Sequence, residues 1–562
     1  MMAKRAHPYP QVEIAALDLV DTAMGSVPAS ASITEALRTA RRRDVRALVL
    51  GDAVVLRDDL ARAASLNVGG ARAQALARPV PVVDARAREI GVRRYLAGGS
   101  PLVVVRDGRR ILGGIARRPE MDHAMSLADR LARRVPPEVL TALEAVTRAA
   151  TARDARAYLA GGVVRDAVDG RPIVSPDLDV VVEGDGPGVA RALAEALAAP
   201  LLEHARFLTA TVGPTAAGRI DVATARSERY DARGALPRVM PSSIDQDLRR
   251  RDFTVNAMAV ELASGSFGLL DRSGGRADLA ARRLRVLHPA SFVEDPTRIF
   301  RAARYAARLD LRPDAWTARC EAWALSLAPY PALSGARILA ELHHLLHDAR
   351  PDVALVRLGA GGAYRLLEPG YRFTRSTRAT VAAVPPTLAW ARERGLDVVA
   401  VELLLVAVLA DQDRDVVSAA LRRLELVGEP RARVGRAVED GEALKRSVAR
   451  ASRASERARL LRGRSALELA WVHLGGEAAL RAHVEWFREA GTTRGSLRGD
   501  DVIALGVPLG PRVAAALDAL RDARLDGEVA GRSEEEAFVR AWSRDDRARN
   551  AGGRDHSSGK ER

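Results

Sequence analysis

The sequence is poor in cysteine and lysine and has no long apolar run. Cys320 is the one cysteine among 562 residues, which excludes a disulfide framework and is typical of a protein kept in a reducing cytoplasm. Nowhere do eighteen apolar residues follow one another, and the first residues, MMAKRAHPYPQVEI, contain no apolar signal core. We therefore expect a soluble, cytoplasmic protein.

Lysine occurs only at positions 4, 445 and 560, so that arginine supplies 84 of the 87 basic residues, and the formal net charge is +15. A basic balance suits a polyanionic partner such as RNA. Arginine almost without lysine is also what a coding bias produces, so the charge alone does not identify a nucleic-acid-binding protein. The length allows three or four domains.

Residues 158–179, YLAGGVVRDAVDGRPIVSPDLD, combine two glycines with two aspartates one residue apart. Gly161 and Gly162 carry no side chain and let the backbone approach a ligand closely. If a helix follows, Arg165 and Asp166 lie in its first turn, where free N–H groups favour anions such as phosphate. The segment therefore predicts a phosphate-binding turn.

Asp177 and Asp179 precede the apolar run VVVE. The alternation of a strand puts both carboxylates on one face, where they repel unless a cation lies between them. A hard divalent cation such as Mg²⁺ is the natural occupant. Two glycines alone are more often a tight turn, and two such aspartates alone are more often a solvated loop. Their joint occurrence favours a site for metal and phosphate.

These motifs resemble the head of class II tRNA nucleotidyltransferases and bacterial poly(A) polymerases, whose signature is GGxVRD followed by DxD. The further motifs follow in the family's order: RRDFTVNA at 250–257, LLDRSGGRADLAARRLR at 269–285, EDPTRIFRAARYAARL at 294–309 and SGARILAEL at 334–342. LRGDDVIALGVPLGPRV at 497–513 is similar to the C-terminal helical region, so the resemblance covers about residues 139–545.

Residues 22–120 form two halves of similar pattern, in which helices alternate with short apolar strands and Asp107-Gly108 predicts a hairpin turn. They resemble a tandem pair of CBS modules, which implies an adenine nucleotide as a ligand and a homodimer formed through the pair. The Thr-x-x-Asp that contacts ribose in such modules is replaced by Leu56 with Asp59 in the first half. Because Leu56 makes no hydrogen bond, a purely structural module is the alternative.

In the second half, Arg117 and Glu120 stand at the same two positions. The expected fold class is α+β, with the CBS pair, a mixed α/β nucleotidyltransferase head and an all-α neck, body and tail. The expected boundaries are 1–125 for the pair, 126–155 for a linker and leading helix, 156–290 for the head, 291–350 for the neck, 351–549 for an RNA-binding helical body and tail, and 550–562 for a disordered end.

The resemblance assigns further site residues. Asp221, in the apolar segment RIDVATAR, is expected on a strand beside Asp179 and would be the third carboxylate for two Mg²⁺ ions. The alternative is a partly exposed aspartate on an edge strand. Arg251 would contact the nucleotide and Asp252 would help to read the ribose.

Base selection is expected at Asp295 and Arg298, which share a helix face with Arg301 if the whole segment is helical. A carboxylate accepts from the exocyclic amino group of cytosine or adenine, and a guanidinium donates to the neighbouring ring nitrogen; guanine and uracil present a carbonyl instead of the amino group. Arg301 would meet the triphosphate. If the motif is taken alone, the alternative to base selection is a surface salt bridge between Asp295 and these arginines. Arg337 and Glu341 are expected to form an i, i+4 pair that braces the neck.

The sequence therefore predicts template-independent transfer of CMP and AMP, from CTP and ATP, to the 3′ end of tRNA. Complete CCA addition, terminal A addition and poly(A) tailing share these motifs and stay open. An RNA-binding regulator without catalytic activity, whose CBS pair senses adenylates, is the alternative from another class.

Overall fold

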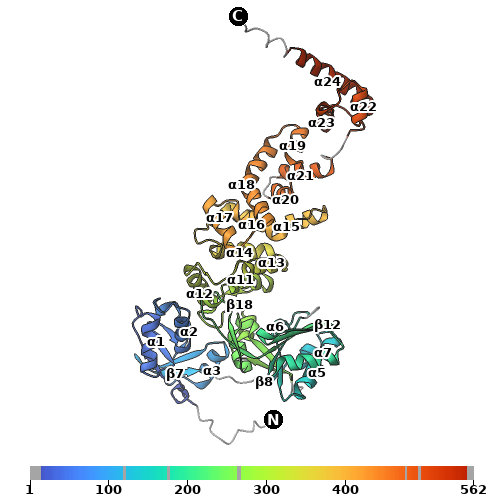
Figure 1. Ribbon diagram of the computed structural model, residues 1–562. Helices are drawn as coiled ribbons and strands as arrows, with labels where there is room; N and C mark the ends of the chain where they lie inside the picture. The colour runs from blue at the N-terminus through green and yellow to red at the C-terminus, as the bar shows by residue number, and fades with distance from the viewer. Residues whose placement is uncertain are drawn as a thin grey trace, which may run out of the picture. The chain divides into compact units, whose positions relative to one another are not determined.

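The computed structural model describes residues 14–117, 122–173, 177–262, 267–474, 478–490 and 495–552. The chain divides into two compact units, one up to Gly370 and one from Tyr371 onward (Figure 1). Among the described helices, none has the length and apolarity needed to cross a bilayer.

The N-terminal part of the first unit contains two small sheets, as the two similar halves of the sequence predict. The first sheet has the order β1-β2-β3-β4 and the second the order β5-β6-β7. The expected hairpin is confirmed, since Asp107 pairs with Arg110 across its turn. The elements are β1 (Met24–Ser26), α1 (Ile33–Arg42), β2 (Ala47–Leu50), β3 (Ala53–Leu56), α2 (Arg57–Ser65), β4 (Arg78–Pro79), β5 (Val82–Asp84), α3 (Glu89–Ala97), β6 (Leu102–Asp107) and β7 (Arg110–Ala116).

The head is built on an eight-stranded sheet with the order β11-β12-β13-β10-β9-β16-β17-β8. Its strands are β8 (Asp122–Ser126), β9 (Arg156–Ala160), β10 (Leu178–Glu183), β11 (Leu201–His204), β12 (Thr209–Thr215), β13 (Gly218–Thr224), β16 (Met258–Glu261) and β17 (Gly268–Asp271). Its helices are α4 (Ala128–Ala132), α5 (Pro137–Thr151), α6 (Gly162–Asp169), α7 (Gly186–Ala196), α8 (Ile244–Arg250) and α9 (Gly275–Ala280). A separate hairpin consists of β14 (Arg226–Arg229) and β15 (Arg238–Pro241).

The alternation of side chains along β10 decides which face of the sheet carries the acids. Val181 belongs to a buried cluster with Tyr158 of β9 and with Ile244 and Leu248 of α8. Asp179 lies two residues before Val181 and therefore on the same face. The carboxylate of Asp179 therefore lies next to the apolar patch that α8 covers, on the same face of the sheet.

The neck follows the head and is helical apart from two-residue strands. It contains α10 (Ser291–Glu294), α11 (Thr297–Leu309), α12 (Ala315–Ser326) and α13 (Gly335–Leu346), and α14 (Pro351–Ala360) follows it. β18 (Arg283–Leu284), at the end of the head, pairs with β19 (Arg312–Pro313) of the neck.

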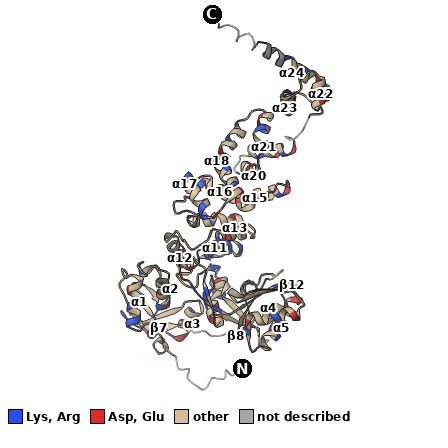
Figure 2. Cartoon of the chain, viewed as in Figure 1, with Lys and Arg blue, Asp and Glu red and all other residues tan. Residues whose placement is uncertain are grey.

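The second unit is all-helical in its described residues. Both basic and acidic positions occur along its helices, as Figure 2 shows. Its helices are α15 (Arg375–Glu393), α16 (Ala400–Leu409), α17 (Arg414–Arg423), α18 (Gly428–Arg450), α19 (Ala454–Leu461), α20 (Ala466–Leu474), α21 (Ala478–Glu489), α22 (Gly499–Ala504), α23 (Pro511–Leu525) and α24 (Arg532–Gly552). Pro385 and Pro386 lie inside α15. Buried Val381 and Val384 before them and Trp390 after them keep the helix packed, which offsets the lost N–H groups.

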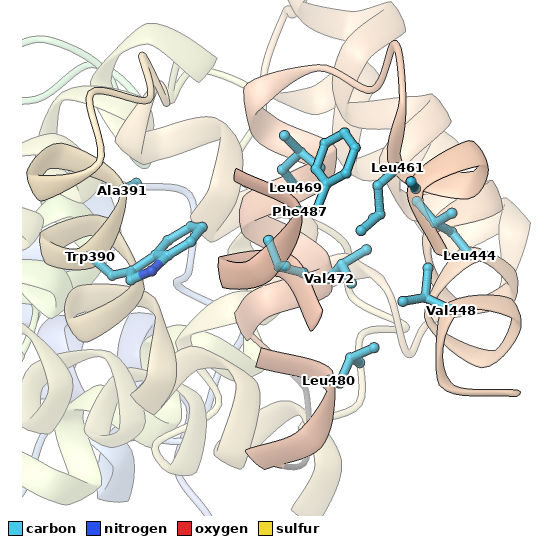
Figure 3. Close-up of a cluster of buried hydrophobic side chains, with 11 residues drawn as sticks. Trp390, Ala391, Leu444, Val448, Leu461, Leu469, Val472, Leu480 and Phe487 are labelled. Carbon is cyan, nitrogen blue, oxygen red and sulfur yellow. The ribbon is translucent and has the colours of Figure 1, made fainter. Parts of the chain in front are cut away.

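One apolar core of this unit brings α18 against α20. Leu444 and Val448 of α18 pack in a single cluster with Leu469 and Val472 of α20 (Figure 3). The close approach of the two helices requires a small residue on α18. Gly441 fills this position, because a Cβ there would lie 2.4 Å from Nε1 of the buried Trp471.

Gly441→Ala should destabilise this unit by about 1–2 kcal/mol, since the overlap with a rigid buried ring outweighs the higher helix propensity of alanine. Gly435→Ala is the matched control on the same helix, because a Cβ at Gly435 meets no atom within 4 Å. The control should raise the stability by about 0.5–1 kcal/mol. Thermal unfolding of both variants checks the prediction, and equal melting temperatures would contradict it.

Candidate functional site

The two glycines form the sharp turn between β9 and α6. Gly161 has φ +74° and ψ −137°, a conformation that side chains strongly disfavour. A Cβ on Gly161 would also lie 2.4 Å from Oδ2 of Asp179. The turn therefore needs glycine for its backbone and for the room that the carboxylate occupies.

The strand register brings two of the predicted acids together. β10 runs parallel to β13 and antiparallel to β9, and Asp179 is paired in register with Asp221. Neighbouring strands lie about 4.8 Å apart, so the two carboxylates project side by side from one face. The predicted position of Asp221 beside Asp179 is confirmed. Asp177 lies just before β10 and is exposed.

The surroundings of these acids are charged and polar. Thr211 donates from Oγ1 to Oδ1 of Asp221 at 2.6 Å, and Nη2 of Arg219 lies 3.0 Å from the other oxygen. Burial raises the pKa of Asp179, and the charges of Asp221 and Asp177 add to this effect while Arg251 opposes it. A cation between the carboxylates would relieve their repulsion.

The donor set fits a hard metal ion, because it consists of carboxylate oxygens. Within the described ranges, however, no three His, Cys, Asp or Glu side chains already converge as a metal-binding group. Asp177, Asp179 and Asp221 instead line one cavity of about 1100 Å³.

Arg165 and Asp166, which line this cavity, take part in a hydrogen-bond network. Arg165 is buried and donates to both oxygens of Asp166, at 2.8 and 3.0 Å, and to Oδ1 of Asn256 at 2.8 Å. Asn256 in turn donates from Nδ2 to Asp252 at 3.2 Å. The guanidinium of Arg165 thus ties the glycine turn to the 3₁₀ turn that holds Asn256.

Asp252 and Arg301 are paired at the edge of the cavity. Nη2 of Arg301 lies 2.7 Å from Oδ2 of Asp252, whose other oxygen accepts from the N–H of Phe253. Burial favours a protonated Asp252, but the charges of Arg301 and Arg298 and the hydrogen bonds from Asn256 and Phe253 together hold the pKa of this carboxyl below its usual value. Arg251 contacts Asp247 at 3.3 Å and lines the same cavity.

The predicted helix over Asp295, Arg298 and Arg301 is partly wrong. Asp295 lies between α10 and α11 in extended conformation, with φ −135° and ψ 95°. The following Pro296 explains this, since proline disfavours helical geometry in the residue before it. Arg298 and Arg301 do lie one turn apart on α11, and all three residues line the cavity.

Hydrogen bonds fix the orientation of the predicted base-reading pair. The bonds that Asp295 accepts from described residues all end on Oδ1: from N and Oγ1 of Thr297, at 3.0 and 2.7 Å, and from Arg337 at 2.8 Å. Arg298 donates from Nη1 to Oγ of Ser291 and from Nη2 to the carbonyl of Arg250. Oδ2 of Asp295 and Nε of Arg298 take part in none of these bonds.

Sequence reasoning missed several residues that shape this wall. Arg337 contacts Asp295 and the carbonyl of Gly234 instead of bracing Glu341. Tyr230 accepts a 3.4 Å hydrogen bond from Arg298 and donates to Glu228 at 2.9 Å. Tyr230 is the one aromatic residue of the polar segment 226–235, which was the available signal. No local pattern marks Arg337 as a partner of Asp295.

In the N-terminal part, Asp59 is buried and paired with Arg78 at 3.1 Å, while Leu56 begins the next helix as its N-cap. The equivalent Glu120 lies outside the described residues. The resemblance to a CBS pair and its adenine nucleotide stays a prediction.

Comparisons with known proteins agree with the motifs. Residues 157–285 match the family described as the Poly A polymerase head domain. An A-adding tRNA nucleotidyltransferase of Geobacter sulfurreducens is 32% identical over 75% of the chain, which spans about half, 48%, of that protein. A CC-adding tRNA nucleotidyltransferase of Deinococcus radiodurans is 34% identical over 69% of the chain and 90% of its own length.

The fold is likewise similar to a solved structure, the Thermotoga maritima CCA-adding enzyme complexed with tRNA. The TM-score is 0.62 and the identity 26%, over 74% of this chain and 98% of the other. The mixed α/β head with its helical continuation is therefore shared with this enzyme. Because the Deinococcus relative is matched over nine-tenths of its length, the chain belongs to the tRNA nucleotidyltransferase family.

Proposed function

We propose that the protein is a template-independent nucleotidyltransferase that adds AMP or CMP, from ATP or CTP, to the 3′ end of tRNA. The observation that supports this most is the joint lining of one cavity by the glycine turn, the paired Asp179 and Asp221, and the pair Asp295 and Arg298. A nucleotide can thus lie with its phosphates at the acids and its base at the neck.

In the proposed reaction, the 3′-hydroxyl of the RNA attacks the α-phosphorus of the nucleotide. A new P–O bond forms, the bond to the bridging oxygen breaks, and pyrophosphate leaves with that oxygen. Asp177, Asp179 and Asp221 would hold Mg²⁺, which would favour deprotonation of the hydroxyl and neutralise the departing pyrophosphate. Arg251 and Arg301 line the cavity as the cationic groups for the triphosphate.

Asp295 and Arg298 would select the base. Oδ2 of Asp295 would accept from the exocyclic amino group of adenine or cytosine, and Nε of Arg298 would donate to the adjacent ring nitrogen. The bonds that Thr297 and Arg337 donate to Asp295, and the bond that Ser291 accepts from Arg298, hold both side chains in place. Guanine and uracil carry a carbonyl where adenine and cytosine carry the amino group. This carbonyl has no hydrogen to donate to the carboxylate, so these bases are rejected.

We further propose that the head comprises residues 156–290, to which β8, α4 and α5 add an edge strand and two helices from the preceding segment, that the neck comprises residues 291–350 and that the helical body and tail comprise residues 351–549. Arginines that recur on α18 and α19, such as Arg431 and Arg459, would follow the RNA backbone. A homodimer formed through the N-terminal pair remains part of this proposal.

Extension of three labelled tRNAs, ending before CCA, after CC and after CCA, tests the proposal with ATP, CTP or both plus Mg²⁺. Three added nucleotides followed by a stop would establish complete CCA addition. Extension of only the CC-ended tRNA would establish terminal A addition, and long ladders would establish a poly(A) polymerase. No extension on any tRNA would contradict the proposal and favour the RNA-binding regulator.

A further inference from the structure

Glu294, the residue before Asp295, is a buried carboxylate. Its side chain is 4% exposed. A buried charge is costly unless a positive partner contacts it directly. Two groups lie close enough: Nη1 of Arg62 donates to Oε1 at 2.8 Å, and Nε2 of His288 lies 3.4 Å from Oε2.

His288 does not provide the positive charge. Burial lowers the pKa of His288 well below its usual value, and the guanidinium groups of Arg62 and Arg298 lower it further. The imidazole is therefore neutral at neutral pH. Burial raises the pKa of Glu294, and Arg62 is the strongest of the charges that oppose this. Arg62 is thus the contacting counter-ion that keeps Glu294 in place.

Arg62 comes from α2 in the N-terminal part, 232 residues before Glu294. Other contacts hold this part against the head and neck. The guanidinium of Arg78 lies 4.2 Å above the ring of Trp316, Arg285 donates to the carbonyl of Gly99 at 2.7 Å, and Arg319 donates to the carbonyl of Ala77. Loss of Arg62 alone therefore leaves the N-terminal part attached.

Glu294 is coupled to the base-reading pair through α10. It ends this one-turn helix, whose first residue, Ser291, accepts the 2.7 Å hydrogen bond from Arg298. The carbonyl of Glu294 accepts from the N–H of Gly234, and Asp295 follows directly. A displacement of Glu294 would therefore move Asp295. It would also move Ser291, whose hydroxyl holds Arg298 in place.

We propose that Arg62 is a positioning residue for base selection, through which the N-terminal part of the chain holds Asp295 and Arg298 in their reading geometry. The inference rests on the proposed function. It gives the N-terminal part a role in the choice of nucleotide that needs no ligand of its own.

The test uses the full chain and a CC-ended tRNA. Arg62→Met should lower the ratio of kcat/KM for ATP over GTP by roughly tenfold and raise the KM for ATP. Arg62→Lys keeps the charge but not the planar guanidinium, so it should give an intermediate ratio. Arg57→Met is the matched control on α2, because Arg57 pairs with the exposed Asp44; its ratio should equal that of the wild type. Melting temperatures show that each variant is folded.

Several outcomes would overturn the inference. An unchanged ratio in folded Arg62→Met, in a preparation whose wild type is active, would overturn the inference alone. The same loss of discrimination in Arg57→Met would also overturn it. If Arg62→Met unfolds, folded Arg62→Lys decides, and an unchanged ratio there would count against the inference. A wild type without nucleotide addition would overturn the proposed function and the inference with it.

Discussion

Asp179→Ala should lower the rate of nucleotide addition by roughly a thousandfold or more and leave the protein folded. Asp179 lies between Asp221, its partner in the strand register, and the glycine turn. Its carboxylate would be one of the proposed metal ligands, and alanine offers no oxygen in its place. Single-turnover extension of a labelled tRNA measures the loss, and a rate near that of the wild type would refute the assignment.

The stability of Asp179→Ala should not fall with its activity. Burial raises the pKa of Asp179, so the charged carboxylate is disfavoured in the folded protein and costs stability at every pH above that raised pKa. The alanine variant should therefore melt at the same temperature as the wild type or higher at neutral pH.

Asp185→Ala is the matched control for this pair of measurements. Asp185 caps α7 by accepting from the N–H of Gly188 at 2.9 Å, and it does not line the cavity. Its loss should cost about 1 kcal/mol of stability and leave the rate unchanged. The two aspartates lie only six residues apart in the sequence. Their alanine variants would then show that one residue governs activity and the other stability.

Gly161→Ala is expected to have the second largest effect. The positive φ of Gly161 is strained for alanine by about 1–3 kcal/mol, and the added methyl group would push against Oδ2 of Asp179. A carboxylate displaced by about 1 Å loses roughly a hundredfold in rate. Stability and activity should therefore fall together, in contrast to Asp179→Ala.

Gly162→Ala provides the comparison for stability. Gly162 begins α6, and the nearest atom to a Cβ there is Nη2 of Arg165 at 3.5 Å, an ordinary contact. We expect its melting temperature to stay near that of the wild type. Equal stability losses in both glycine variants would contradict the assignment of the loss to the positive φ of Gly161 and to its close approach to Asp179.

Local patterns predicted the acidic half of the site well. The apolar run VVVE correctly placed Asp179 at a strand, the resemblance together with the apolar segment RIDVATAR correctly placed Asp221 on a strand beside it, and the register aligned the two. Short apolar runs are features that a sequence displays directly.

The half of the site that we propose to read the base was less predictable from the sequence. Spacing suggested one helix, but Pro296 excludes Asp295 from it. The contacts of Arg337 with Asp295 and of Arg62 with Glu294 join segments 42 and 232 residues apart. Such contacts depend on tertiary packing of arginine, and in a chain with 84 arginines no local signal distinguishes the few that matter.

The hairpin that carries Asp221 has an implication for protein engineering. β12 and β13 meet again at Thr215 and Gly218, after an irregularity that follows Val212, and the turn between them leaves Ala216 exposed. Residues added at Ala216 would lengthen only the tip of the hairpin. One residue added within β13 would turn Asp221 to the opposite face of the sheet. The tip is therefore a suitable point for a fluorophore or an affinity tag.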